Sequence, residues 1–166
     1  MKKRIFALIL ALSLMLSLAS CMKSGLNGAD KTYTIECMTV TLTDGFKPVE
    51  YEGYTACFDS TDVAVFCLKE SFDLAEGFGD YTLEQYAALV AQANADKNPT
   101  TTTESGIPVL EYTFHNEELD ITYGYMIATY KCGDAFWMVQ FACEESAYAD
   151  SRDTFVRWAS SVTFAD

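Results

Sequence analysis

The chain is poor in basic residues and almost lacks histidine. Its 166 residues include 11 lysines and arginines against 24 aspartates and glutamates, and His115 is the only histidine. Nucleic-acid binding depends on lysine and arginine replacing the counterions of phosphates, so we expect no nucleic-acid partner. The six cysteines form no C-x-x-C pair, and one histidine cannot complete an ordinary structural zinc site. We therefore expect neither a metal centre of that kind nor a cofactor.

A hydrophobic run of membrane-spanning length is also missing. Residues 5–16 are almost entirely apolar and follow three basic residues at positions 2–4, but serines interrupt the segment before it reaches the length of about 20 residues that a spanning helix needs. A basic cap, a short apolar segment and small residues ahead of a cleavage point are typical of a signal peptide. Residues 1–20 are therefore predicted to be a signal peptide that is removed.

The sequence at the predicted cleavage point, "LASC", resembles the lipobox of bacterial lipoproteins. The resemblance implies cleavage before Cys21 and a diacylglycerol thioether on that cysteine, which makes membrane lipid the first expected partner. Each buried methylene of an acyl chain such as palmitate contributes about 0.8 kcal/mol, so two chains hold a protein stably. We expect a lipoprotein anchored to the cell membrane on its extracytoplasmic face. The alternative is an ordinary secreted protein with a cysteine there by chance.

Loss of the signal peptide would make the chain more acidic, because it removes three basic residues and no acidic one. Eight basic and 24 acidic residues remain, a formal charge of −16 with histidine neutral. Such a domain is expected to stand off an anionic bilayer. Residues 21–31 are small, polar and without periodicity, which predicts a lipidated N-terminus and a flexible tether. Residues 32–166 suit one domain.

Alternating and β-branched segments predict an antiparallel sheet. Residues 33–42 alternate apolar side chains with threonine and are predicted as one half-buried strand, ending at the turn "TDGF". Residues 51–58 and 63–68 predict a hairpin, and the second segment is apolar on both faces, as in a central strand covered on both sides. Three further strands are predicted at residues 109–114, 119–130 and 135–143, the last two joined by "KCGD".

Two helices complete the predicted fold. The first begins after Thr82 as its N-cap and ends near Lys97, and the second covers residues 148–161. The order β-β-β-α-β-β-β-α packs as an antiparallel β-sheet with a helix on each face, an α+β fold of the α/β/α sandwich type. A cystatin-like or other α+β domain is the alternative fold.

Four segments resemble the PsbP-like superfamily, which includes DcrB-like bacterial lipoproteins. They are "TDGF", "YTLEQYAALV", the hairpin of "YGYMIATY" and "FWMVQFAC", and "FVRWASSVTF" as a helix leading into a terminal strand. The resemblance lies in layout, covers most of the chain after the tether and includes no catalytic residue. Members of this superfamily mainly act as accessory or binding proteins, so the resemblance implies a non-enzymatic role.

Candidate binding residues lie among the aromatics of the long hairpin. Tyr123, Tyr125 and Trp137 could line a binding surface, where tyrosine and tryptophan are enriched, although most such strand residues pair across strands or fill a core. We predict an accessory or binding domain of the cell envelope, with a ligand or another envelope protein as its partner. The alternative is a small lipid-anchored hydrolase that uses acidic residues, for which no carboxylate pair is marked by spacing.

Two further groups of residues have simpler interpretations. The turn that holds His115, Glu117, Glu118 and Asp120 could attract a cation but lacks the order of a calcium loop, so we interpret it as a solvated acidic turn. Besides Cys21, five cysteines remain, an odd number that leaves at least one outside any internal disulfide. We expect mostly reduced thiols that fill space as small apolar side chains.

Overall fold

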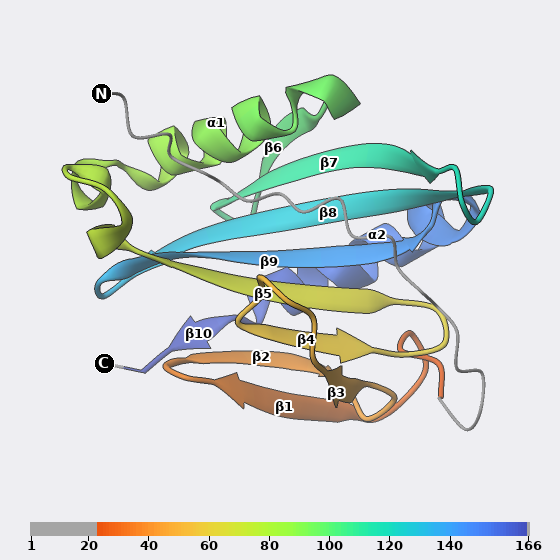
Figure 1. The fold of residues 1–166 in the computed structure, drawn as a ribbon. Coiled ribbons are helices and arrows are strands. Elements are labelled where there is room, and N and C mark those ends of the chain that lie inside the picture. The colour runs from red at the N-terminus through yellow and green to blue at the C-terminus, as the bar shows by residue number, and fades with distance from the viewer. Residues whose placement is uncertain (1–22, 166) are drawn as a thin grey trace.

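The computed structural model describes residues 23–165, which form two antiparallel sheets and two α-helices (Figure 1). The strands are β1 (Asp30–Ile35), β2 (Met38–Thr43), β3 (Lys47–Val49), β4 (Ala56–Asp59), β5 (Ala64–Ser71), β6 (Thr100–Glu104), β7 (Ile107–Asn116), β8 (Ile121–Cys132), β9 (Ala135–Glu144) and β10 (Thr163–Phe164). The helices are α1 (Leu83–Ala93) and α2 (Glu145–Ser160), with short 3-10 helices η1 (Phe72–Leu74), η2 (Phe78–Asp80) and η3 (Ala95–Lys97).

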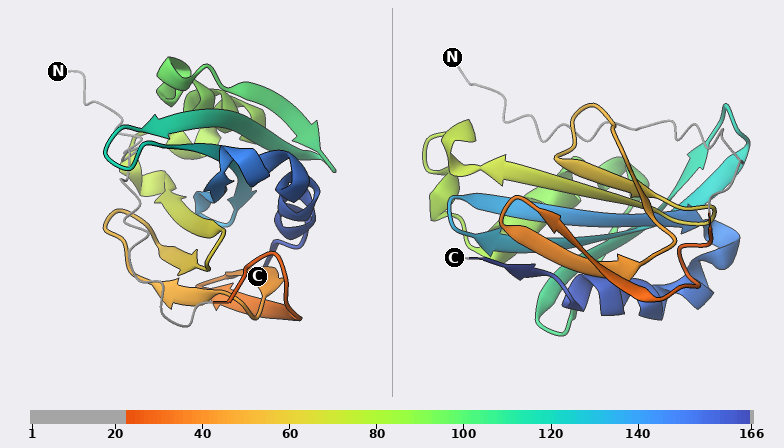
Figure 2. Two further views of the ribbon diagram at one scale, coloured as in Figure 1. Left: turned by 90° about the vertical axis from the view of Figure 1, so that its right-hand side faces the viewer. Right: turned by 90° about the horizontal axis from the view of Figure 1, so that it is seen from below.

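The larger sheet has seven strands in the order β3-β4-β5-β9-β8-β7-β6. It curves strongly when viewed along its strands (Figure 2, left). The long hairpin of β8 and β9 lies near its middle, and β5 pairs with the far edge of β9. Because side chains alternate along a strand, this sheet contributes to two separate hydrophobic clusters, which we call the inner and the outer cluster.

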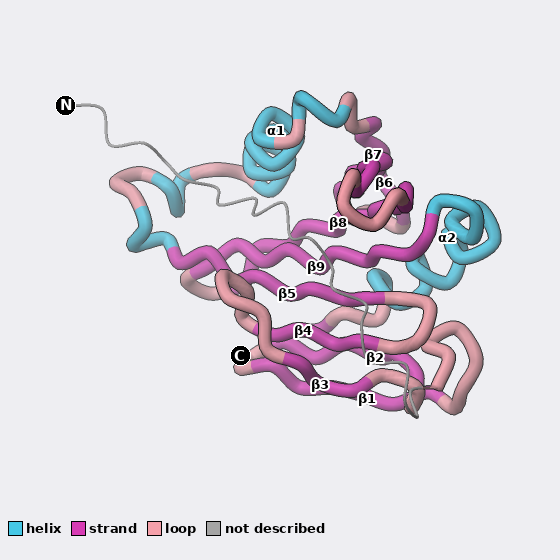
Figure 3. The backbone as a smooth tube through the Cα atoms, turned by 45° about the vertical axis from the view of Figure 1, so that its right-hand side comes forward, coloured by secondary structure: helices cyan, strands magenta, loops and turns pink. Residues whose placement is uncertain are grey.

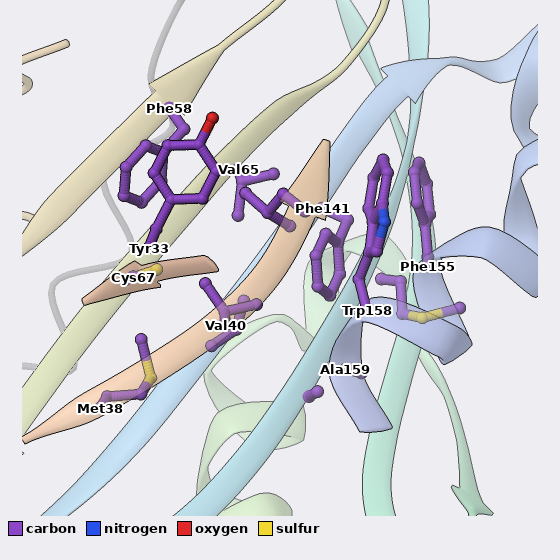
Figure 4. Close-up of a cluster of buried hydrophobic side chains, with 14 of the residues drawn as sticks. Tyr33, Met38, Val40, Phe58, Val65, Cys67, Phe141, Phe155, Trp158 and Ala159 are labelled. Atoms are coloured by element: carbon purple, nitrogen blue, oxygen red, sulfur yellow. The ribbon is translucent and has the colours of Figure 1, made fainter. Parts of the chain in front are cut away.

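The inner cluster contains the buried apolar side chains of α2 and of the smaller sheet. Phe155 and Trp158 of α2 contact the ring of Phe141 on β9, and Val40 of β2 lies in the same cluster (Figure 4). Phe155 and Trp158 have no exposed surface. Burying an aromatic side chain of this size stabilises the fold by about 2–3 kcal/mol, so these rings fix α2 against the strands.

The outer cluster contains the two large buried side chains of α1. Tyr86 and Val90 lie on one stripe of this helix, and the Tyr86 ring stacks on Phe136 of β9 with 4.2 Å between ring centroids. The predicted N-cap is confirmed, because the Thr82 hydroxyl accepts a hydrogen bond from the backbone N–H of Gln85, whose side chain accepts one from the backbone N–H of Thr82. The helix ends at Ala93, earlier than predicted.

The prediction of one strand over residues 33–42 is wrong. The chain turns at residues 36 and 37, where Glu36 adopts a left-handed backbone with φ 51°, and β1 pairs back onto β2. The alternation of apolar and polar residues continues through this turn, so the pattern alone does not reveal that the chain reverses. The hairpin forms a second sheet with β10 in the order β1-β2-β10, which corrects the prediction of a single sheet.

Two strands of the larger sheet were not predicted. β3 is only three residues long and contains Pro48, which is tolerated here because β3 is an edge strand. β6 consists of four threonines and Glu104 and forms the opposite edge. The predicted hairpin is present as β4 and β5, but its first strand begins at Ala56, so residues 51–55 of the predicted strand lie in a turn instead. Val65 to Cys67 of β5 are buried on both faces of the sheet, as predicted.

Candidate functional site

A buried carboxyl group on β5 is the starting point of the candidate site. Glu70 is 8% exposed, and its Oε2 accepts a 2.6 Å hydrogen bond from the hydroxyl of Tyr86 on α1. Burial raises the pKa of the Glu70 carboxyl, and the hydrogen bond from Tyr86 opposes that shift. Burial also raises the pKa of Tyr86, so its hydroxyl keeps its proton and acts as the donor. The pair joins the first turn of α1 to the sheet.

An apolar pocket of about 290 Å³, which we call the Glu70 pocket, lies beside this pair. Its walls are Phe78 of η2 and the α1 residues that face it, and Glu70 supplies the one ionisable carboxyl group of the lining. The lining residues are Glu70, Phe78, Tyr86, Leu89, Val90, Gln92 and Ala93. Small-molecule sites have this character, with mostly apolar walls and a few placed polar groups that fix orientation.

Lys131 of β8 holds the wall of this pocket against the sheet. Its ammonium group donates hydrogen bonds of 2.8 and 2.7 Å to the backbone carbonyls of Gly79, within η2, and of Tyr81, which follows η2 and leads into α1. The same ammonium lies 5.2 Å from the ring centroids of Phe72 and Phe136. These contacts fix η2, and with it the position of Phe78 over the ring of Phe136. Sequence reasoning missed this site because no spacing links β5, η2 and α1.

Two of the predicted binding residues, Tyr123 and Tyr125, lie in the outer cluster on β8. Their rings are 6.5 Å apart, and Tyr125 stacks on Tyr112 of β7 at 5.0 Å. Tyr123 also lines a second pocket, of about 270 Å³, which includes Asp62 and Glu144. The Tyr123 hydroxyl is buried and makes no hydrogen bond with any described residue.

The third predicted binding residue, Trp137, lies on the opposite side of the larger sheet. It belongs to the inner cluster, has no exposed surface and packs against the ring of Phe164 at 6.0 Å. The structure therefore brings Tyr123 and Tyr125 together and separates Trp137 from them. Alternation along β9 explains the separation, because Phe136 and Trp137 must point to opposite faces.

A polar network clamps α2 to the edge of the larger sheet. The Arg152 guanidinium donates hydrogen bonds of 2.7 to 3.2 Å to both carboxylate oxygens of Glu111 and a 2.6 Å bond to Glu104. The hydroxyl of Tyr148 donates to Glu111 at 2.7 Å. Burial favours the protonated acid, yet the hydrogen bonds from Arg152 and Tyr148 outweigh it and lower the pKa of Glu111. Each charged group of this network has a partner within it, so we interpret the network as one that stabilises the fold.

The predicted lipidation residue, Cys21, lies outside the described residues, but the segment that follows it is held tightly. The carbonyl of Lys23 accepts a 3.1 Å hydrogen bond from the backbone N–H of Thr61 in the β4–β5 turn. Asp62 of the same turn accepts bonds of 2.5 Å from the Ser24 hydroxyl and 2.6 Å from the backbone N–H of Gly25. Most of the predicted tether therefore lies against the domain.

The acidic turn between β7 and β8 forms no metal site in residues 23–165. His115 Nε2 lies 3.6 Å from Asp120, while its Nδ1 lies 3.1 Å from the Thr122 hydroxyl. Within the described part of the chain, no group of three or more histidine, cysteine, aspartate or glutamate residues could hold a metal ion.

The buried thiols behave as apolar core residues. Cys57, Cys67 and Cys143 are at most 3% exposed and form no disulfide. Burial raises the pKa of Cys57 and of Cys67 to about 12 and that of Cys143 to about 11. A thiol needs its thiolate form for nucleophilic attack, so none of the three is suited to catalysis at neutral pH.

No described helix is both long enough and apolar enough to cross a membrane.

Comparisons with known proteins identify the fold. No protein-family model matches the sequence, and no curated protein is similar to it in sequence. The solution structure of cyanobacterial PsbP (CyanoP) from Synechocystis sp. PCC 6803 is similar with a TM-score of 0.53 and 14% identity, over 89% of this chain and 99% of that chain. A crystal structure from Bacteroides thetaiotaomicron is similar with a TM-score of 0.53 and 11% identity, over 84% of this chain and 49% of that one.

A third structure is LpqN, involved in cell envelope biogenesis of Mycobacterium tuberculosis, with a TM-score of 0.47 and 12% identity over 78% of this chain and 83% of that chain. This chain spans about half the length of the Bacteroides protein. At 14% identity the likeness to CyanoP concerns the fold alone, and at that level it agrees with the expected resemblance. The described domain has a PsbP-like α+β fold.

Proposed function

We propose that the protein is an extracytoplasmic lipoprotein, anchored to the cell membrane through acylated Cys21, whose domain binds a ligand or partner in the envelope without catalysing a reaction. The basic cap, the apolar segment and "LASC" support the anchor. An α/β/α arrangement, with α1 and α2 on opposite faces of the larger sheet, is part of this proposal. It places the Glu70 pocket beside α1.

The observation that carries the binding role is the Glu70 pocket. Its apolar walls favour a small apolar group, and its one carboxyl group can hydrogen-bond to a polar atom on that group. Tyr86 engages Oε2 of Glu70, which leaves Oε1 available to the occupant. The expected occupant is therefore a small amphipathic molecule, or an apolar side chain of an envelope protein that ends in a hydrogen-bonding group.

The positions of the buried carboxyl groups argue against the alternative of an acidic hydrolase. Asp59 is also 8% exposed, and burial raises its pKa against the effect of a 2.8 Å hydrogen bond from Tyr51. It pairs with Ala64 at the start of β5, six residues before Glu70. Six strand residues span about 20 Å, whereas two catalytic carboxylates lie about 5–9.5 Å apart. Glu70 and Asp59 therefore cannot act on one bond.

The second pocket offers no better catalytic pair. Asp62 lines it together with Glu144, but both oxygens of Asp62 already accept hydrogen bonds from the chain around Ser24 and Ser60. His115 is absent from its lining.

The anchor is tested by Cys21→Ala in the full chain. We expect the variant to carry no lipid and to leave the membrane fraction, as measured by labelled palmitate and by fractionation. Membrane retention and lipid labelling equal to those of the unaltered protein would refute the anchor.

The binding role is tested by a photo-crosslinking residue in place of Leu89, which lines the pocket, and in place of Ala88, which is exposed on α1 outside the pocket lining. In native envelopes we expect a discrete adduct from position 89 that is lost in Glu70→Ala, and no such adduct from position 88. Equal labelling from both positions, or cleavage of envelope glycans by the purified domain, would overturn the proposal.

A further inference from the structure

We propose that the end of the domain formed by the β4–β5 and β7–β8 turns and the start of α2 lies directly on the membrane surface, with Leu119 at the lipid head groups. The inference rests on the acylation of Cys21 proposed above. It specifies the orientation of the domain and assigns lipid contact to a surface remote in sequence from the anchor.

The chain between the proposed anchor and the first contacts with the fold is short. Lys23 is bound to Thr61, and Ser24 and Gly25 are bound to Asp62. Gly25 lies so close to Ser60 that a Cβ atom would clash with the Ser60 hydroxyl, so the segment is packed as well as hydrogen-bonded. Residue 21 precedes residue 23 by two positions, and two residues reach at most about 7 Å. An acylated Cys21 would hold this end of the domain at the bilayer.

Two turns and the end of β9 lie at this same end of the domain. The register pairs Asp59 with Ala64, Ala64 with Ala142, and Asn116 with Ile121, so the β4–β5 turn, the end of β9 and the β7–β8 turn follow one another along one rim of the sheet. Figure 1 shows all of them at the right-hand end, together with the start of α2. Figure 3 shows η1 and η2 at the opposite end of β5.

An exposed apolar side chain also lies on this rim. Leu119, in the β7–β8 turn, is 39% exposed. The other large apolar side chain that is exposed in residues 23–165 is Leu74, which is 65% exposed and lies in η1 at the opposite end of the sheet. Of the two, only Leu119 lies at the end that an acylated Cys21 would hold at the bilayer. Its neighbours Glu117, Glu118 and Asp120 are acidic, so the tip is suited to zwitterionic head groups and would be repelled by anionic lipid. This revises the expectation that the domain stands off the bilayer.

This orientation also determines on which side of the domain, relative to the membrane, the Glu70 pocket lies. Glu70 pairs with Phe136 near the β8–β9 turn, at the end of the sheet that carries η1 and η2. This end would face away from the membrane, where soluble ligands and envelope proteins can reach it.

The test uses acylated full-length protein in phosphatidylcholine vesicles, with p-benzoyl-phenylalanine in place of Leu119 or, as the matched control, in place of Leu74. Both positions are exposed, so neither substitution disturbs the core. We expect at least a tenfold higher yield of lipid adduct from position 119 than from position 74. Equal yields, or a higher yield from position 74, would overturn the orientation.

A second variant tests the short connection. Ten glycine and serine residues inserted between Met22 and Lys23 should reduce the adduct yield at position 119 several-fold, while flotation with the vesicles is unchanged. An unchanged yield would overturn the role of the short connection. Failure of the proposed anchor gives a different result, because the protein would then carry no acyl group and would not float with vesicles in any variant.

Discussion

The Tyr86 hydroxyl and the Glu70 carboxyl form a 2.6 Å hydrogen bond between α1 and β5, with both side chains at least nine-tenths buried. A buried carboxyl group with one hydrogen-bond donor is costly to ionise. Its protonation state therefore links the stability of the fold to pH and decides what the adjacent pocket can bind.

Glu70→Gln should change the pH dependence of stability. Folding raises the pKa of Glu70 above its ordinary value of 4.5, so the folded state binds the proton more tightly, and stability falls as pH rises from 4.5 through the folded pKa. Glutamine mimics the protonated acid and does not titrate. We expect the stability of the variant relative to the unaltered protein to increase as pH rises from 4 to 8, measured by urea unfolding. Glu117→Gln, on the surface, is the control, and an equal effect there would contradict the prediction.

Arg152→Ala should destabilise the domain by about 2 kcal/mol at pH 7, because it leaves the half-buried Glu111 without its main hydrogen-bond donor. The lowered pKa of Glu111 means that the stability contributed by this pair is lost as pH falls through the folded pKa, so the difference should shrink at pH 3. Chemical unfolding at the two pH values measures both effects.

The matched control is Arg157→Ala. Arg157 pairs with Asp30 at 3.1 Å, but both side chains are more than half exposed. Exposed ion pairs contribute about 0–1 kcal/mol, so we expect a smaller loss than for Arg152→Ala. Equal losses in the two variants would show that the buried network has no special role.

Gly124→Ala should destabilise the contact between β8 and α2. A Cβ atom at this position would lie 2.5 Å from the ring of Tyr148, close to the base of that side chain, where little movement is possible. We expect a loss of about 1–3 kcal/mol, typical of overpacking. In a Tyr148→Ala background the same substitution should cost much less, and a double-mutant cycle measures the difference. Additive losses would contradict the contact.

Local patterns predicted most of the elements of the fold. The N-cap at Thr82, the long β8–β9 hairpin and the doubly buried β5 each depend on residues close in sequence, and each is present. The reversal at Glu36 was missed because a left-handed glutamate carries no signature in the alternation of apolar residues. Without that turn, the second sheet could not be predicted.

The candidate site was harder to predict than the fold. Glu70 looks like an ordinary polar residue near the end of a strand, and its burial is decided by Tyr86, η2 and α1, which reach it from later in the chain. Tyr123 and Tyr125 were identified as aromatic residues of one strand, but whether such residues line a surface or fill a core depends on what covers each face. That information is tertiary, and no spacing encodes it.

The short strand β10 pairs Thr163 and Phe164 with Thr39 and Met38 of β2, so β2 is paired on both edges, with β1 on one side and β10 on the other. The smaller sheet is complete only when residues 163–164 have reached a strand that lies more than 100 positions earlier in the chain. Deletion of residues 163 and 164 would leave one edge of β2 unpaired, and an unpaired edge strand is a site at which other chains can pair and aggregate.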